Sequence, residues 1–131
     1  VYNTHLDHIG EKARVNGVRL ILDSLARRSS TPVFLLGDFN SERGGDVYNL
    51  VGSSGFVKDS YGVAQKKFAS GGTFNAFDTG EEPRKIIDFV FVNEKVEVMR
   101  YSVPNNFYWK SGKPRYYSDH FPVCLLVKLK K

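Results

Sequence analysis

A short apolar segment that ends in polar residues most constrains how this chain can fold. Residues 33–36 are four consecutive apolar residues between a turn-prone segment and Gly37, which predicts a short buried strand. Asp38 and Asn40 follow two positions apart, and residues at i and i+2 of an extended chain point to the same side. An acid and an amide would then project together from the end of a rigid element. The Asp-Phe-Asn sequence is equally typical of an Asx turn that leaves a sheet.

A second predicted strand contains a carboxylate where an apolar residue is expected. Residues 86–92 read Ile-Ile-Asp-Phe-Val-Phe-Val, the strongest strand pattern in the chain. An ionised Asp88 is unfavourable to bury without a partner, so it either faces solvent or is paired. His120, at the start of the last predicted strand, is the obvious partner. A neighbouring carboxylate fixes the tautomer of an imidazole and raises its pKa, which prepares it for proton transfer or charge stabilisation.

The other segments predict a mixture of helices and strands. We expect a strand over residues 1–6, helices over 11–28 and 46–51, strands over 96–103 and 121–129, and a long loop over 104–117 that carries Trp109. Residues 53–69 are ambiguous, and a helix could cover 61–68. Cys124 is the only cysteine. It excludes an internal disulfide and a multi-cysteine zinc site, and we expect it to be an inert core residue.

The length and charge of the chain limit the classes of function. A chain of 131 residues is at most one ordinary domain. Its longest apolar runs are too short to cross a bilayer, and no signal-peptide pattern opens it, although it does not start with Met. The net charge of +5 favours anionic partners such as nucleic acid or phosphate. It fits an ordinary solvated surface about equally well.

Acids and imidazoles at predicted strand ends suggest a divalent cation. Asp119 precedes His120, and His5 ends the first predicted strand, whereas His8 stands in a turn where a histidine needs no special role. Magnesium takes oxygen ligands from one or two carboxylates and keeps several waters. Without a cluster of cysteines, this set of side chains favours magnesium or manganese over structural zinc.

Four motifs occur along the chain in this order: Asn-Thr-His-Leu-Asp-His at 3–8, Gly-Asp-Phe-Asn at 37–40, Ile-Asp-Phe-Val-Phe at 87–91 and Ser-Asp-His-Phe-Pro-Val at 118–123. Together they resemble the endonuclease/exonuclease/phosphatase superfamily, which includes deoxyribonuclease I, abasic-site endonucleases, sphingomyelinases and inositol-polyphosphate 5-phosphatases. Each motif is weak alone, but their order and spacing match the superfamily over nearly the whole chain. The resemblance implies a four-layered α/β sandwich of the deoxyribonuclease I-like type. It also implies magnesium-dependent hydrolysis of phosphate esters by in-line attack of water.

The resemblance assigns roles to individual residues. Asp38 would orient or deprotonate the water, and Asn40 would hold the phosphate or, alternatively, the metal. His120, oriented by Asp88, would stabilise charge or act as acid or base. The remaining assignments are His5 as a donor to the same phosphate, Asp119 and Asp38 at the metal, and His8, Asn75, Phe77 and Arg84 on the substrate side. Core packing would explain Phe77 equally well.

One departure from the superfamily pattern affects the expected activity. Its domain begins with a half that carries an Asn and the Glu that is the principal metal ligand, and the glutamates here lie in unlike contexts. Residues 1–131 therefore resemble the C-terminal portion of one such domain, and the missing half is expected in the full-length protein. The isolated chain should be inactive or nearly so. The alternative is a non-catalytic fragment or binding module.

The resemblance does not select one substrate class, and nucleic acid, phospholipid, inositol phosphate and other esters all fit it. Abasic-site endonucleases rank low, because they resemble this chain less at the first motif, with an aromatic residue where His5 stands.

Overall fold

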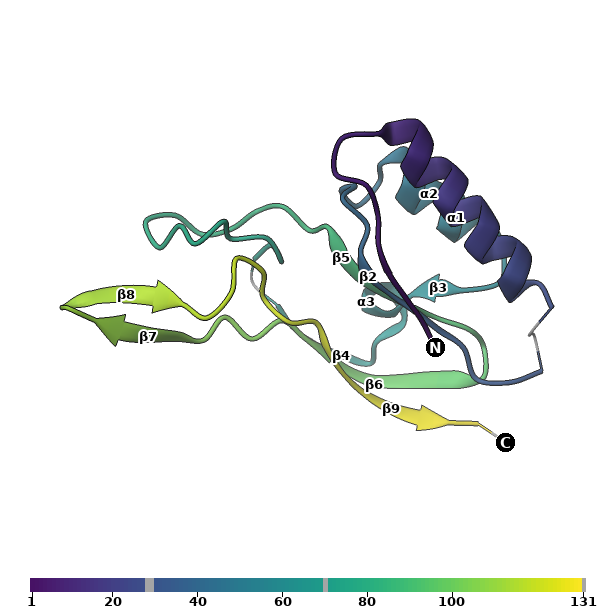
Figure 1. The fold of residues 1–131 in the computed structure, drawn as a ribbon. Helices are drawn as coiled ribbons and strands as arrows, with labels where there is room; N and C mark the ends of the chain where they lie inside the picture. The colour runs from purple at the N-terminus through teal and green to yellow at the C-terminus, as the bar shows by residue number, and fades with distance from the viewer. Residues whose placement is uncertain (28–29, 70, 131) are drawn as a thin grey trace.

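The computed structural model describes residues 1–27, 30–69 and 71–130. The chain folds into mixed sheets with helices, an α/β arrangement from which one hairpin projects (Figure 1). The elements are β1 (Tyr2–His5), α1 (Glu11–Leu25), β2 (Phe34–Asp38), α2 (Asp46–Ser53), β3 (Lys58–Asp59), α3 (Ser60–Val63), β4 (Lys66–Phe68), β5 (Asp88–Val92), β6 (Val96–Ser102), β7 (Phe107–Lys110), β8 (Lys113–Tyr116) and β9 (Cys124–Leu129).

The strand register of the larger sheet brings three polar residues to one end. Its order is β1-β2-β5-β3, with β1 parallel to β2 and β5 antiparallel to β2. In this register His5 lies opposite Asp38, and Asp38 lies opposite Asp88. Three residues that are far apart in the sequence thus become neighbours across adjacent strands.

Helices α1 and α2 cover one face of this sheet (Figure 1). Apolar residues at helical spacing on α1, such as Val18 and Leu22, pack with Leu35, Phe39 and Phe91 of the sheet side. The helix ends at Leu25, earlier than the predicted residue 28; residues 26 and 27 form a turn, and residue 28 lies outside the described part. None of the described helices combines the length and hydropathy that a bilayer crossing needs.

The opposite face of the larger sheet packs on a second sheet of order β4-β6-β9. Val90 and Val92 meet Val96, Val98 and partly buried residues of β9 there. Side chains of a strand alternate between faces, so Leu125 and Val127 point inward while Cys124 and Leu126 point outward. The expectation that Cys124 is a core residue was therefore wrong, because its thiol side chain is exposed.

Two segments differ from the sequence-based expectation. The predicted helix over residues 61–68 is limited to α3, and β4 follows it as a strand parallel to β6. Pairing with the neighbouring strand decides the conformation of this short segment. The predicted loop over 104–117 contains the β7–β8 hairpin, whose turn residues Ser111 and Gly112 have φ values of 51° and 72°. Positive φ at both turn positions is typical of a two-residue type I′ hairpin.

Gly37 permits the close approach of β1 and β2 next to the polar cluster. Its φ is +134°, and a Cβ there would lie 1.8 Å from the carbonyl oxygen of Thr4. Neither the backbone angle nor the space suits a side chain at this position.

Replacing Gly37 by alanine should destabilise the fold and displace β1. We expect a loss of at least about 2 kcal/mol in the free energy of unfolding, from backbone strain and the clash with Thr4. Urea denaturation measures it. Gly52→Ala is the matched control, because nothing lies within 4 Å of its added Cβ. A Gly37→Ala protein as stable as Gly52→Ala would contradict the close approach.

Candidate active site

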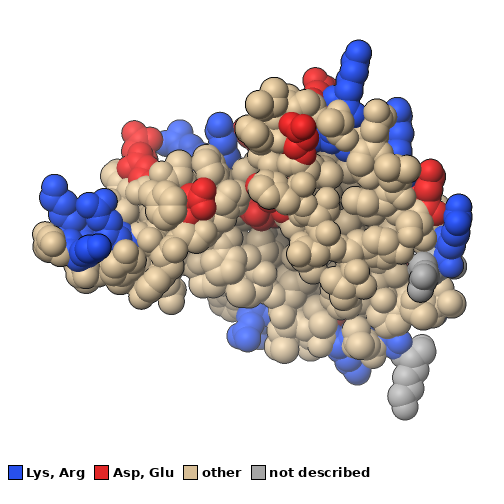
Figure 2. Space-filling model, viewed as in Figure 1, with Lys and Arg blue, Asp and Glu red and all other residues tan. Residues whose placement is uncertain are grey.

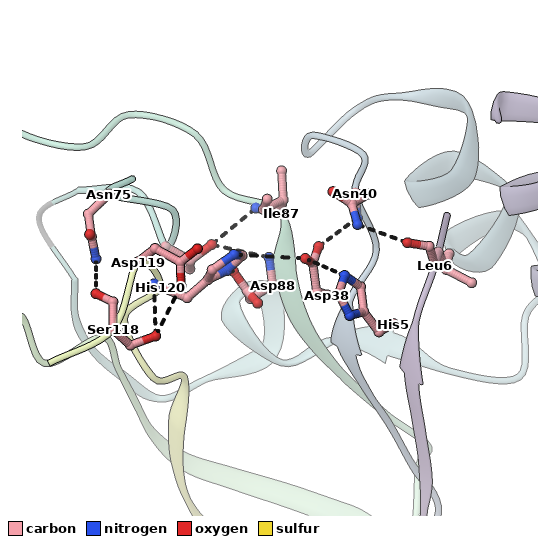
Figure 3. A network of polar contacts seen from close by, with 11 residues as sticks. His5, Leu6, Asp38, Asn40, Asn75, Ile87, Asp88, Ser118, Asp119 and His120 are labelled. Atoms are coloured by element: carbon pink, nitrogen blue, oxygen red, sulfur yellow. Dashed lines mark hydrogen bonds and ion pairs between the residues drawn. The ribbon is translucent and has the colours of Figure 1, made fainter. Parts of the chain in front are cut away.

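Two histidine–aspartate pairs meet at the end of the larger sheet (Figure 3). The Nε2 atom of His5 lies 3.3 Å from Oδ2 of Asp38, and Nδ1 of His120 lies 2.8 Å from Oδ2 of Asp88. The other ring nitrogen of His120 lies 3.9 Å from Oδ2 of Asp38. Asp38 therefore has an imidazole on each side. The predicted convergence of His5, Asp38 and His120, and the predicted pairing of Asp88 with His120, are both present.

A backbone clamp holds His120 in this position. The backbone N–H groups of Asn75 and Ala76 donate to the carbonyl oxygen of Asp119 at 2.8 and 3.1 Å, and the Phe121 N–H donates to Thr73 O at 2.7 Å. The Phe74 ring packs edge-on against the imidazole of His120, with 5.0 Å between centroids. The segment over residues 73–76 thus fixes the segment over 119–121 from both sides.

Thr73 connects this clamp to Asp88, a role that sequence reasoning missed. Its hydroxyl oxygen accepts the N–H groups of Ile87 and Asp88, both at 3.1 Å, and the residue is fully buried. A threonine between two glycines and a phenylalanine gives no separate signal in the sequence. Its function depends on backbone groups more than ten positions away, which only the fold brings near.

The environment of His120 favours its protonated form. Partial burial alone would lower the pKa of the imidazole. The hydrogen bond to Asp88 and the negative charges of Asp88, Asp38 and Asp119 outweigh burial and raise the pKa above its ordinary value. With Nδ1 donating to Asp88, the proton on Nε2 is the one directed toward Asp38 and any group bound beside it.

Asp38 is held by the Asx turn that the sequence left as an alternative. Its Oδ1 atom accepts the backbone N–H of Asn40 at 2.7 Å, and Asn40 has a positive φ of 46°. The side-chain amide of Asn40 donates to the Leu6 carbonyl at 2.8 Å, and the Leu6 N–H donates back to Asp38 O at 2.9 Å. The turn and the site are therefore one structure, in which Asn40 joins the ends of β1 and β2.

The four residues predicted on the substrate side do not form one group. The side chain of Asn75 is buried, donates to Ser118 O at 3.1 Å and accepts the Phe77 N–H at 2.8 Å. It supports the clamp. Phe77 is 57% exposed, so the alternative that it packs in the core was wrong. Arg84 is exposed and lines a cavity of about 330 Å³ that none of the residues in the two histidine–aspartate pairs lines. His8 is exposed in the turn before α1, outside the network of Figure 3.

The end of the larger sheet carries oxygen and nitrogen donors of the kinds that bind a divalent cation. One atom each of Asp38, Asp88 and His120 lies within 4.8 Å of the others, a grouping that could hold a metal ion. Asp88, however, is closely paired with Nδ1 of His120 at 2.8 Å. Asp38 is the less tightly paired carboxylate, because its Oδ2 atom lies 3.3 Å from His5 and 3.9 Å from His120. The Asp119 carboxylate accepts the Ser118 hydroxyl at 3.3 Å. Asp119, the other acid predicted at the metal, is not a member of this group among the described residues. A magnesium ion bound by Asp38 would take water or phosphate as its other ligands.

The sequence that builds this site matches a known protein family. A model of the Endonuclease/Exonuclease/phosphatase family matches residues 2–120. The chain belongs to this family. No curated protein matches it.

Solved structures share this fold closely. A mannosyl-6-phosphatase of Bacteroides thetaiotaomicron is 36% identical with a TM-score of 0.89, over 97% of this chain and 50% of that one. An endonuclease/exonuclease/phosphatase family protein of the same organism is 37% identical with a TM-score of 0.88, over 95% and 47%. A Staphylococcus aureus beta toxin with bound magnesium ions shares the fold at 14% identity and a TM-score of 0.63, over 98% and 52%. This chain thus spans about half the length of each.

Replacing Asp88 by asparagine should lower the pKa of His120 and change how stability depends on pH. The raised pKa means that protonation of His120 stabilises the fold below the ordinary pKa of histidine, and that this contribution is lost as the pH rises through the folded-state value. Burial is the largest single influence and lowers the pKa of His120, and without the Asp88 carboxylate only the charges of Asp38 and Asp119 would oppose it. An NMR titration of the imidazole and urea unfolding between about pH 5 and 8 measure both effects.

The control is Asp46→Asn, an exposed carboxylate in the first turn of α2. It should leave the titration of His120 unchanged. An unaltered pKa of His120 in Asp88→Asn would show that the negative charge of Asp88 does not govern the protonation of the ring.

Proposed function

We propose that this chain carries the imidazole–carboxylate part of a site that hydrolyses phosphate esters by in-line attack of water. The observation that supports this most is the position of Asp38 between His5 and His120. A phosphoryl group beside Asp38 would meet two ring nitrogens that can donate, and a carboxylate that can orient a water molecule. Such reactions depend chiefly on positioning and on stabilisation of negative charge.

His120, Asp38 and His5 would have different roles in the reaction. Asp88 raises the pKa of His120 and so favours its cationic form against the opposing effect of burial. The Nε2–H of the ring would then stabilise charge on a phosphoryl oxygen or protonate the leaving group. Asp38, with Oδ1 occupied by the Asn40 N–H, would use Oδ2 to orient or deprotonate the attacking water. His5, whose side chain is 75% exposed, is free to turn toward the same phosphate.

Magnesium, or manganese, is the cofactor that we propose for this site. Asp119 and Asp38 would hold the ion through carboxylate oxygens. When bound, it supplies neutralisation of the charge that develops on the phosphoryl oxygens. The chemistry of these oxygen donors supports the proposal.

We further propose that the chain is the C-terminal portion of a longer domain. The proposal is supported by the extent of the matches, which cover nearly all of this chain and about half of each relative. It is also supported by the small number of free carboxylates at the site, which would leave a magnesium ion with few protein ligands. The second candidate, a non-catalytic binding module, follows from the same shortage of ligands.

The full-length gene product should hydrolyse phosphate esters only with magnesium or manganese present. Asp38→Asn and His120→Gln should each lower kcat/KM by about 100-fold or more, because each removes a group that acts on the reacting atoms. A panel of bis-p-nitrophenyl phosphate, sugar phosphates including mannose 6-phosphate, and nucleotides measures activity and substrate class together. Chelation with EDTA should abolish turnover, and added magnesium should restore it.

Asp23→Asn is the matched control, since this carboxylate is exposed on α1 and distant in the sequence from every motif. It should keep full activity. Activity that survives Asp38→Asn, or that is insensitive to EDTA, would contradict the proposed roles.

The 131-residue chain alone should show little or no turnover on the same panel. The reason is that Asp38 and Asp119 leave most of the metal coordination to other groups. Turnover by this chain comparable to that of the full-length product would refute the division of the site between two portions. No activity in either protein would instead favour the binding module.

A further inference from the structure

The β7–β8 hairpin is a separate feature whose position relative to the site is fixed. It projects away from the helices and the two larger sheets (Figure 1). Its register runs from Phe107 opposite Tyr116 to Lys110 opposite Lys113. At its base, the ring of Tyr116 packs edge-on against Phe121 at 4.9 Å between centroids, and Phe121 follows His120 directly.

The hairpin carries positive charge and has no acidic residue of its own. Residues 104–117 contain Lys110, Lys113 and Arg115 and no Asp or Glu. All three side chains belong to exposed residues, and none takes part in the ion pairs found among the described residues. Figure 2 shows a dense group of basic side chains at this end of the molecule. The hairpin therefore presents a cationic surface whose three charges form no ion pair with a carboxylate of the described residues.

The two faces of the hairpin differ in chemistry. Residues directly opposite in an antiparallel pair lie on the same face, and successive residues alternate. Tyr108 is opposite Arg115, and two positions further Lys110 is opposite Lys113, so all four share one face. The ring of Tyr117 joins it, at 4.9 Å from that of Tyr108. We call these five residues the cationic face; the other face carries Phe107, Trp109, Pro114 and Tyr116.

We propose that the cationic face binds single-stranded nucleic acid. Proteins bind single strands by combining cations that follow the phosphates with aromatic rings on which bases stack. Both kinds of group lie here on one strand pair whose β7 strand extends about 13 Å. Tyr117, which is 73% exposed, also lines a cavity of about 200 Å³ together with His120. A strand on the cationic face can therefore continue along Tyr117 to the proposed hydrolytic site.

Other occupants fit this surface less well. Insertion into a membrane needs apolar side chains at the tip, but the tip here reads Lys-Ser-Gly-Lys, and Phe107 and Trp109 lie behind it. A second copy of the chain would bring two cationic faces together, which is repulsive. A small ester with one phosphate group would leave most of the three cations without a partner.

Fluorescence anisotropy with a labelled oligothymidylate of about twelve nucleotides tests the proposal. The measurement uses the full chain in EDTA, so binding is read without hydrolysis. Replacing Lys110, Lys113 and Arg115 together by glutamine should weaken binding more than tenfold and reduce the salt slope by about 2. Tyr108→Ala and Tyr117→Ala should each weaken it about tenfold through lost stacking.

The control removes three positive charges elsewhere, through Lys12→Gln, Arg19→Gln and Lys128→Gln, all at exposed positions outside the hairpin. This variant should bind almost as well as the parent chain. Emission from Trp109, the chain's single tryptophan, and circular dichroism confirm that each variant keeps its hairpin and fold.

Three results would overturn the proposal. The first is equal weakening by the control and hairpin variants, which would indicate binding through net charge. The second is inorganic polyphosphate competing as well as oligothymidylate while the tyrosine variants bind normally. The third is binding to vesicles of anionic phospholipid without binding to the oligonucleotide. Because binding is measured in EDTA, its failure leaves the hydrolysis of small esters untouched, and loss of hydrolysis leaves binding untouched.

Discussion

The pairing of β2 with both of its neighbours is the constraint on which the site depends. Its register aligns His5, Asp38 and Asp88 across three adjacent strands, and Gly37 allows β1 to approach closely enough for this alignment. A shift of one residue would turn every side chain of a strand to the opposite face. The apolar residues that fill the two cores thus also determine where the polar cluster forms.

The fourth member of the cluster comes from a different part of the fold. His120 reaches Asp88 because the segment over residues 73–76 binds the backbone on both sides of it and because Thr73 binds the Asp88 N–H. The imidazole is thereby held in one orientation before any substrate arrives. Preorganised charge of this kind is what electrostatic catalysis requires, since groups that are already oriented need no rearrangement during the reaction.

Much of the fold could be predicted from local patterns, and the failures share a cause. The helix α1 and the strand β5 have strong periodicity and were predicted at nearly their observed positions. The β7–β8 hairpin and β4 were missed, because their conformations depend on pairing and on a turn with two positive φ angles. Cys124 was misplaced for a related reason: the sequence of β9 is apolar on both faces, and only packing shows which face is covered.

The sequence alone determined which chemical groups are available, namely three imidazoles and several carboxylates, together with a family resemblance carried by four motifs. The tertiary structure decided which of these groups meet and which are already satisfied. Asn40 and Asn75 have the amide groups expected of ligand contacts, yet each binds a backbone carbonyl 34 or 43 positions away in the chain. The physical reason is that hydrogen-bond partners and burial depend on distances in space. Strand register sets those distances between segments that are far apart in the sequence, and no local sequence pattern specifies which segments will meet.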